Sequence, residues 1–272
     1  MEQVVIFLHI IGHNVRFRVI GSRHYRSIET VHHYFGVVLR AILKLYKPVI
    51  RLPYESTPNE IRNNPMFYPY FKDCIGALDG THVLVSIPFS IQGRFYSRKG
   101  RTTQNILVAI TFDLKFSYIL VGWEGSAHDS RILGDALSSP RGLIIPEGKY
   151  YLADARYNIR NEYITPYRGV RYHLKEFSAQ GLENAKKLFN LHHLLLQITI
   201  ERVFGILKKQ FRVLDAEPFW NFQTQVDIVL ACRIIDNHIM GVDPSDLLNQ
   251  GLYEEPESNL IILTLTKQEV RE

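Results

Sequence analysis

Cysteine is scarce in this chain of 272 residues, which contains only Cys74 and Cys232. The two are far apart and belong to no cysteine-rich spacing, so the sequence offers neither a disulfide framework nor a cysteine-based zinc site. This excludes the class of small secreted proteins that disulfides hold together. We therefore expect a protein of a reducing, intracellular compartment.

Long apolar runs are absent as well. The N-terminal run V-V-I-F-L-H-I-I is short, follows an acidic residue and precedes no small-residue cleavage site, unlike a secretory signal. No stretch approaches the roughly 20 apolar residues that are needed to cross a bilayer. The sequence thus predicts a soluble protein with no membrane partner.

The composition shows no strong bias. With 46% hydrophobic and 22% charged residues, the chain is close to an ordinary globular protein, which excludes collagen-like, low-complexity and largely disordered chains. The formal net charge is a modest +5, but residues 1–51 are basic and residues 241–272 form an acidic tail. Such blocks suggest that one half faces a polyanion. A drift of surface charge along the chain explains the same distribution equally well.

Two helices are predicted near the N-terminus, over Gln3–Ile11 and Ser27–Leu45, and the basic stretch between them is expected to be irregular. Ser27 is a suitable N-cap residue for the second helix. Residues 1–52 are therefore predicted to form a helical region of helix-turn-helix type that binds DNA. From the pattern alone, a helical bundle that only packs against the next domain is the stronger alternative.

From Cys74 onward the sequence changes to short β-type runs. Three strands are predicted in C-I-G-A-L-D-G-T-H-V-L-V, N-I-L-V-A-I-T-F-D and F-S-Y-I-L-V-G-W, a helix begins near Asp129, and K-Y-Y-L-A-D gives a fourth strand. This order predicts an α/β fold in which helices flank a mixed sheet. The domain is expected to span residues 74–240, with an insertion at about 157–191 before a helix in I-T-I-E-R-V-F-G-I-L and a last helix over Gln223–Met240.

Three acidic residues are singled out by their positions. Asp79 is expected at the end of the first strand, Asp154 at the end of the fourth, and Glu201 on the later helix. In a mixed sheet of this order the first and fourth strands can be adjacent, which would bring the two aspartates together beside the helix. Hard cations such as Mg²⁺ and Mn²⁺ prefer carboxylate oxygens, and two such ions can promote phosphodiester cleavage. The three acids therefore form a candidate catalytic, metal-binding site.

Each of the three acids also has a simpler interpretation. Asp79 precedes a glycine, as in many turns, and Asp154 can cap the segment that follows it. Glu201 can be an ordinary surface acid paired with Lys208. For each aspartate taken singly, the simpler interpretation is the favoured one, because spacing alone is a weak signal.

Three more residues are candidates for supporting such a site. His82 is expected either to contact substrate or to be a structural histidine. His128 and Asp129 are expected either to hydrogen-bond the metal ligands or simply to begin a helix, with Asp129 favoured as the N-cap residue.

A basic loop is predicted between the first two strands, in the run Q-G-R-F-Y-S-R-K-G-R. It contains Arg98, Lys99 and Arg101, no acidic residue, and the aromatic residues Phe95 and Tyr96. Such a hairpin can follow a phosphate backbone while its aromatic rings stack on bases, and Lys208 is a further candidate for a phosphate contact. A solvated, charged hairpin is an equally good interpretation.

The chain resembles the PIF/Harbinger transposase family and its transposase-derived nuclease relatives. The runs that carry the resemblance are I-G-A-L-D-G-T-H, S-R-K-G-R-T-T-Q-N-I-L, V-G-W-E-G-S-A-H-D-S-R-I-L, G-K-Y-Y-L-A-D-A-R-Y, P-Y-R-G-V-R-Y-H-L and I-E-R-V-F-G-I-L-K-K, in family order over about residues 74–212. The resemblance implies an RNase H-like core of the DDE nuclease type, in which Asp79, Asp154 and Glu201 fall on the metal-binding acids.

The resemblance also implies an activity and its partners. The implied function is a divalent-metal-dependent DNA endonuclease that hydrolyses phosphodiester bonds with Mg²⁺ or Mn²⁺. The implied partners are DNA and a separate Myb-like DNA-binding protein, and the implied location is the nucleus, with the cytoplasm as a further location.

The chain departs from the family pattern around the acids. Arg156 replaces a glycine two residues after Asp154, and further departures are Leu194, Gln197, Gln210 and Asp236. Changes in the residues that support metal ligands can cost about 10–100-fold in metal affinity or activity. The alternative function is therefore a domesticated nuclear protein, catalytically weak or inactive, that binds DNA or chromatin. A decayed transposon copy fits these departures as well.

Overall fold

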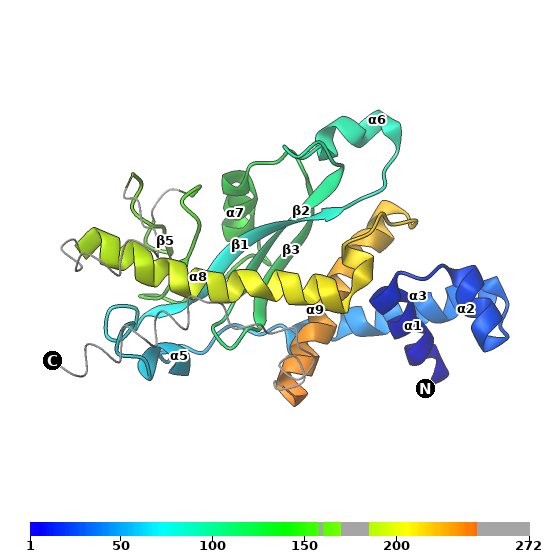
Figure 1. Cartoon of the computed structure of the whole chain (residues 1–272), viewed down its shortest axis with the longest axis horizontal. Coiled ribbons are helices and arrows are strands. Elements are labelled where there is room, and N and C mark those ends of the chain that lie inside the picture. The colour runs from blue at the N-terminus through cyan, green and yellow to red at the C-terminus, as the bar shows by residue number, and fades with distance from the viewer. Residues whose placement is uncertain (158–159, 170–184, 244–272) are drawn as a thin grey trace, which may run out of the picture.

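The computed structural model describes residues 1–157, 160–169 and 185–243 (Figure 1). Most of the predicted acidic tail and much of the predicted insertion lie outside the described residues. The helices are α1 (Glu2–His13), α2 (Phe17–His24), α3 (Ile28–Lys44), α4 (Tyr46–Val49), α5 (Asn59–Arg62), α6 (Phe89–Gln92), α7 (Asp129–Ser138), α8 (Ala185–Gln210) and α9 (Phe222–Val242), the 3₁₀ turns are η1 (Gly93–Phe95) and η2 (Arg212–Leu214), and the strands are β1 (Cys74–Leu84), β2 (Thr103–Ile110), β3 (Phe116–Glu124), β4 (Tyr150–Leu152) and β5 (Tyr163–Ile164).

The strands form one mixed sheet in the order β3-β2-β1-β4-β5. β1 is antiparallel to β2 and parallel to β4, so the first and fourth predicted strands are adjacent, as expected. The parallel pairing of β4 with β5 adds an edge strand inside the predicted insertion, which the sequence did not indicate. With helices on its faces, this sheet is the RNase H-like α/β fold that the sequence predicts.

Alternate side chains of the central strands point to opposite faces of the sheet and are buried in two separate hydrophobic cores. On β2, Ile106 and Val108 belong to the core that the sheet shares with α1, α3, α8 and α9. Leu107 and Ala109, which point the opposite way, belong to the core beneath α7. Figure 1 shows α8 running across the sheet.

The N-terminal helices share their core with the C-terminal part of the chain. Phe7 and Phe35 are buried in the same cluster as the sheet residues. The Phe35 ring stacks on Trp220, just before α9, with ring centroids 5.7 Å apart and an interplanar angle of 6°. The helices at the N-terminus are thus present as predicted, Ser27 caps α3 by accepting from the Thr30 N–H at 3.2 Å, and the bundle packs closely on α9.

The stretch expected to be irregular between those helices is partly helical. It contains α2, Phe17–His24, in which Ile20 and Gly21 are buried. A helix of eight residues is marginal by propensity alone, so tertiary packing is what stabilises it. Local sequence patterns do not report such packing, which is why this helix was missed.

Helix α8 begins earlier than predicted. The expected start near Ile198 is wrong, because the helix already runs from Ala185. Its first half buries Leu191, Leu195 and Leu196 together with polar residues, so no clean apolar periodicity marks it. The predicted insertion therefore ends in helix.

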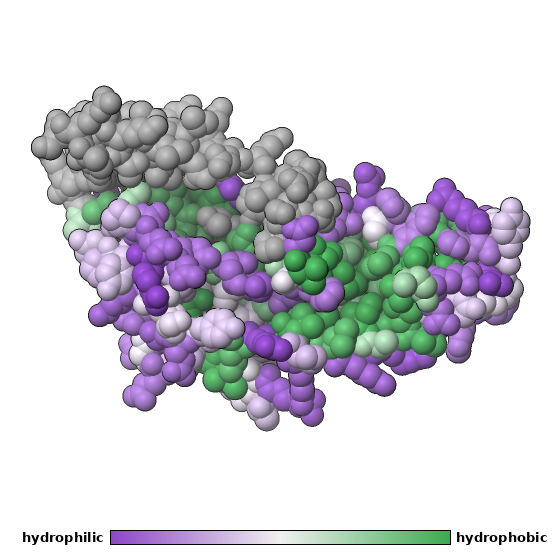
Figure 2. Space-filling view, turned by 90° about the horizontal axis from the view of Figure 1, so that it is seen from below, coloured by the Kyte–Doolittle hydropathy of each residue, from purple (hydrophilic) through white to green (hydrophobic). Residues whose placement is uncertain are grey.

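The surface has an apolar region as well as charged ones. Figure 2 shows a broad apolar area over the half of the molecule that contains the N-terminal helices. On α1, Val4, Val5 and Leu8 keep exposed side chains. None of the described helices has the combination of length and hydropathy required to span a membrane.

Candidate active site

The pairing of β1 with β4 positions the two aspartates. Ala77 of β1 is paired with Leu152 of the parallel strand β4. Asp79 and Asp154 each follow two residues later, so they lie at the same level of neighbouring chains. Because side chains alternate along a strand, Asp79 shares the face of Ala77, which is the face that α8 covers.

Asp79 is not at a strand end, and its prediction as a turn residue is wrong. β1 continues to Leu84 because its pairing with β2 extends to that residue. The β1–β4 pairing, however, reaches only as far as Ala77, so β1 has no β4 neighbour at Asp79. The Asp79 carboxyl group therefore lies where β1 and β4 are no longer paired, although the Asp79 backbone is still part of β1.

Neighbouring acids raise the pKa values of Asp79 and Glu201. Burial raises the pKa of Asp79 to about 7, and the charges of Glu201 and Asp154 act in the same direction. The Gly80 N–H donates to Asp79 Oδ1 at 2.7 Å and offsets part of this rise in pKa. Although Glu201 lies on an exposed part of α8, partial desolvation and then the charge of Asp154 raise its pKa too. The neighbouring strands β1 and β4 and the helix α8 therefore bring the predicted trio into a shared neighbourhood.

The trio does not close around a single point. Among the described residues, no three histidine, cysteine, aspartate or glutamate side chains are near enough to hold one metal ion as they are arranged. Instead, Asp154 is paired with a cation of the chain itself. Arg156 Nε lies 2.8 Å from Asp154 Oδ2, and Arg156 Nη1 lies 3.1 Å from Asp129 Oδ2.

Asp129 faces this arginine and does not cap its helix. His128 occupies the N-cap position of α7 without a side-chain cap bond, and Asp129 is the first helical residue. The Asn105 side-chain amide donates to Asp129 Oδ1 at 3.1 Å. The favoured prediction of Asp129 as the N-cap residue is therefore wrong. Its carboxylate instead accepts from Asn105 of β2 and forms an ion pair with Arg156.

His82 has a structural partner. Its Nδ1 hydrogen-bonds with the Thr103 hydroxyl at 2.9 Å, and burial is the main cause that lowers its pKa. His82 is paired across the strands with Asn105, the residue that holds Asp129. Sequence reasoning missed Asn105, although the polar run T-T-Q-N directly before an apolar strand was a usable signal.

Comparison with known proteins identifies the family. The family described as DDE superfamily endonuclease matches residues 78–237, which is more than half of the chain. The chain belongs to this endonuclease family. The match includes all three predicted acids and confirms the family predicted from sequence. A domain of unknown function matches residues 1–44.

Several curated proteins are similar to this chain, and the similarity covers only part of the length of each. The human "Putative nuclease HARBI1" is 25% identical over 67% of this chain and 51% of the relative. The protein of the same name from Bos taurus is 25% identical over 60% and 45%, and "Protein ALP1-like" of Arabidopsis thaliana is 20% identical over 95% and 65%. The chain thus spans about half the length of the first two relatives. No solved structure matches the chain significantly.

The basic residues predicted to bind DNA lie on two elements. Arg98, Lys99 and Arg101 are exposed on a tight turn that the Ser97 N–H closes by donating to the Arg101 carbonyl at 2.8 Å. Lys208 lies on the last turn of α8. Lys99 and Lys208 both lower the pKa of His82, which shows that the turn and the helix border the same region.

The aromatic residues of this turn differ from the expectation. Phe95 is buried against Phe222, with ring centroids 5.2 Å apart, so it is not available to stack on bases. Arg94 forms an ion pair with Glu124. Tyr96 remains 46% exposed and is the ring of this run that stays accessible. The expectation of two stacking aromatics is therefore wrong for Phe95.

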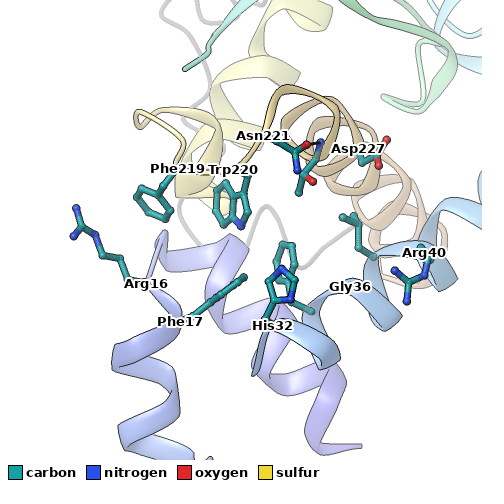
Figure 3. Close-up of a pocket in the computed structure, with 12 residues that line it drawn as sticks. Arg16, Phe17, His32, Gly36, Arg40, Phe219, Trp220, Asn221 and Asp227 are labelled. Atoms are coloured by element: carbon teal, nitrogen blue, oxygen red, sulfur yellow. Dashed lines mark hydrogen bonds between the residues drawn. The ribbon is translucent and has the colours of Figure 1, made fainter. Parts of the chain in front are cut away.

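A pocket of about 820 Å³ lies elsewhere, between α3 and the start of α9 (Figure 3). Figure 3 shows Arg16 and Arg40 on opposite sides of the aromatic residues Phe17 and Trp220. None of the predicted acids lines it, so the pocket and the acidic cluster are separate features. The lining residues are Arg16, Phe17, His32, Phe35, Gly36, Leu39, Arg40, Phe219, Trp220, Asn221, Thr224 and Asp227.

Proposed function

We propose that the chain is a divalent-metal-dependent DNA endonuclease of the DDE type. Its membership of the DDE superfamily endonuclease family supports nuclease chemistry. The observation that carries the proposal is the register of β1 and β4, which sets Asp79 and Asp154 level with each other on the side of the sheet that α8 covers. Glu201 of α8 supplies the third carboxylate.

The donor chemistry of the site suits a hard divalent cation. Three carboxylates offer the oxygen ligands that Mg²⁺ and Mn²⁺ prefer. Their proximity is supported by the charges of Glu201 and Asp154, which help to raise the pKa of Asp79, and by the charge of Asp154, which helps to raise the pKa of Glu201. Asp79, Asp154 and Glu201 would hold the ion. When bound, such ions activate an attacking water and stabilise the leaving oxygen of a phosphodiester.

The basic residues have a separate role in this proposal. Arg98, Lys99 and Arg101 on the turn and Lys208 on α8 contact the phosphate backbone and hold the DNA beside the carboxylates. Phosphate contacts of this kind position the duplex without reading its sequence. In this proposal the acidic residues carry out cleavage, and the basic residues bind the DNA.

Plasmid nicking tests the proposal. Supercoiled DNA incubated with the protein and Mn²⁺ should be nicked, and Asp79→Asn should abolish nicking. Asp113→Asn, which removes the same charge at the turn between β2 and β3, should leave nicking unchanged. Equal nicking by the Asp79 variant, or none by the wild type, overturns the proposal.

A second candidate function is a non-cleaving DNA-binding or chromatin-binding protein. The ion pair between Arg156 and Asp154 favours it, because a resident cation already neutralises one of the acids. DNA binding measured by fluorescence anisotropy, combined with a lack of Mn²⁺ binding by calorimetry, would favour this function over cleavage.

We also propose a nuclear location and a Myb-like DNA-binding partner protein. Both rest on the family to which the chain belongs. A fluorescent fusion tests the location, and co-purification with a candidate Myb-like protein, absent when either protein is omitted, tests the partner.

A further inference from the structure

Arg156 lies between two carboxylates from different elements. Asp154 follows β4, whereas Asp129 begins α7, and each forms an ion pair with a different nitrogen of the same guanidinium. The side chain of Arg156 is 58% exposed, and that of Asp129 is only 16% exposed. The more deeply placed carboxylate therefore anchors a cation whose other partner is a proposed metal ligand.

The backbone around Arg156 is fixed. The Tyr157 N–H donates to the Asp154 carbonyl at 3.0 Å, which closes a turn. The Arg168 guanidinium donates through Nε and Nη2 to the Ala155 carbonyl at 3.1 and 2.9 Å. Because Arg156 is only two residues from Asp154 on this turn, its guanidinium reaches the Asp154 carboxylate without any change in the rest of the fold.

Asp129 is fixed as well. The Asn105 amide, buried on β2, donates to Asp129 Oδ1 and leaves Oδ2 for Arg156. The guanidinium is consequently held from one side by a carboxylate that is itself positioned by the sheet. Arg156 is thus paired with two carboxylates at once, and charge-assisted pairs of this kind are stronger than neutral hydrogen bonds.

In this arrangement Arg156 competes with a metal ion for Asp154. Arg156 Nε already binds Oδ2, and the backbone N–H of Arg156 approaches Oδ1 at 3.4 Å. A divalent cation next to the guanidinium would also meet a like charge at short range. Metal binding at Asp154 therefore has to displace the guanidinium from Oδ2 or proceed against its positive charge.

We propose that Arg156 is a tethered cation that occupies Asp154 in the metal-free protein and lowers the affinity of the acidic site for divalent metal, with Asp129 and Asn105 holding it in position. This inference rests on the proposed metal site. It makes Arg156 the residue that sets how much metal the endonuclease needs.

Titration with Mn²⁺, followed by the electron paramagnetic resonance signal of free Mn²⁺, tests the inference without any activity assay. Arg156→Ala and Arg156→Gln should each bind Mn²⁺ about tenfold or more tightly than the wild type, because the guanidinium no longer competes for Asp154 or repels the ion at short range. Arg156→Lys, which keeps the charge, should stay near the wild-type affinity. Arg160→Ala removes the same charge from an exposed residue four positions on and should leave the affinity unchanged.

Thermal denaturation gives a second measurement. In EDTA, Arg156→Gln should melt below the wild type, because the acids lose their counter-ion. Added Mn²⁺ should then raise its melting temperature by more than it raises that of the wild type.

The outcomes separate the inference from the proposed function. If Asp79→Asn loses Mn²⁺ binding while the neutral Arg156 variants bind no more tightly than the wild type, the inference is overturned and the metal site stands. If Asp79→Asn binds Mn²⁺ as the wild type does, or if no variant binds it, the proposed metal site fails and the inference fails with it.

Discussion

Asp79 and Asp154 lie at the same level of two parallel neighbours, each two residues beyond the paired positions Ala77 and Leu152. The pairing ends there, so the two carboxyl groups are presented at the point where the strands separate. Glu201 approaches from α8, which packs on the same face. This relationship is the basis of the predictions that follow.

Glu201→Gln should reduce Mn²⁺-dependent nicking by about 10–100-fold with little change in stability. Glu201 is exposed and forms no ion pair within the described part of the chain, so its removal disturbs no folded-state ion pair. Nicking rates and thermal melts check this. Glu217→Gln, an exposed charge-matched change, is the control. Unchanged nicking by the Glu201 variant would remove this residue from the site.

The basic turn should account for much of the salt dependence of DNA binding. We expect simultaneous replacement of Arg98, Lys99 and Arg101 by alanine to make the slope of log K against log salt less negative. The change should be up to about 2.7, at about 0.9 for each phosphate that the variant no longer neutralises. Fluorescence anisotropy at several salt concentrations measures the slope.

A second basic set makes the comparison decisive. Alanine replacement of Lys44, Lys47 and Arg51, near the end of the N-terminal helices, removes the same charge elsewhere. It should change the slope less than the turn variant does. A larger change would move the DNA-binding surface to the N-terminal region.

Asp236 should make stability fall as pH rises from about 4 to about 7. It is 2% exposed on α9, and burial raises its pKa from 3.8 to about 7 despite the nearby charge of Arg233. The folded state therefore holds a proton that the unfolded state has released, so the stabilisation is complete below about pH 4 and has disappeared by about pH 7. Urea unfolding at several pH values checks this. In Asp236→Asn this part of the pH dependence should disappear, and an unchanged profile contradicts the assignment.

Phe35→Ala should destabilise the whole fold by about 3–5 kcal/mol. Phe35 is 3% exposed and stacks on Trp220, and the centroid of its ring lies 5.0 Å from the centroid of the Phe7 ring. Because the N-terminal helices and the sheet share one core, urea should still unfold the variant in a single transition. Leu45→Ala, at a residue that is 49% exposed, should cost less than about 0.5 kcal/mol. Separate melting of the N-terminal helices would contradict the shared core.

The sequence predicted the order of the strands well, because each strand is a continuous β-type run with its own boundaries. From that order followed the adjacency of β1 and β4 and the approach of Asp79 to Asp154. The exact place of Asp79 was wrong because a D-G pair suggested a turn, whereas pairing with β2 keeps the chain extended. Local composition cannot report a partner strand.

Other features depend on contacts between distant parts of the chain. Arg156 stands out in the sequence as a departure from the family, but its second partner, Asp129, precedes it by 27 residues and meets it only in the folded protein. The pairing of Asn105 with Asp129 could not be predicted for the same reason, although the polar run T-T-Q-N could have singled out Asn105 itself. Helix α2 and the first half of α8 were missed because tertiary packing, rather than clean periodicity, stabilises them.

Iron-directed cleavage of the protein itself tests most directly whether Asp79, Asp154 and Glu201 form one metal site. Fe²⁺ replaces the metal, and ascorbate with peroxide then produces radicals that cut the backbone close to the bound ion. We predict cuts near all three acids, stronger in Arg156→Ala and absent in Asp79→Asn. Cuts that Asp79→Asn does not change would contradict the account. So would cuts confined to α1, where the rings of His9 and His13, two residues that could bind iron on their own, lie 5.1 Å apart between centroids.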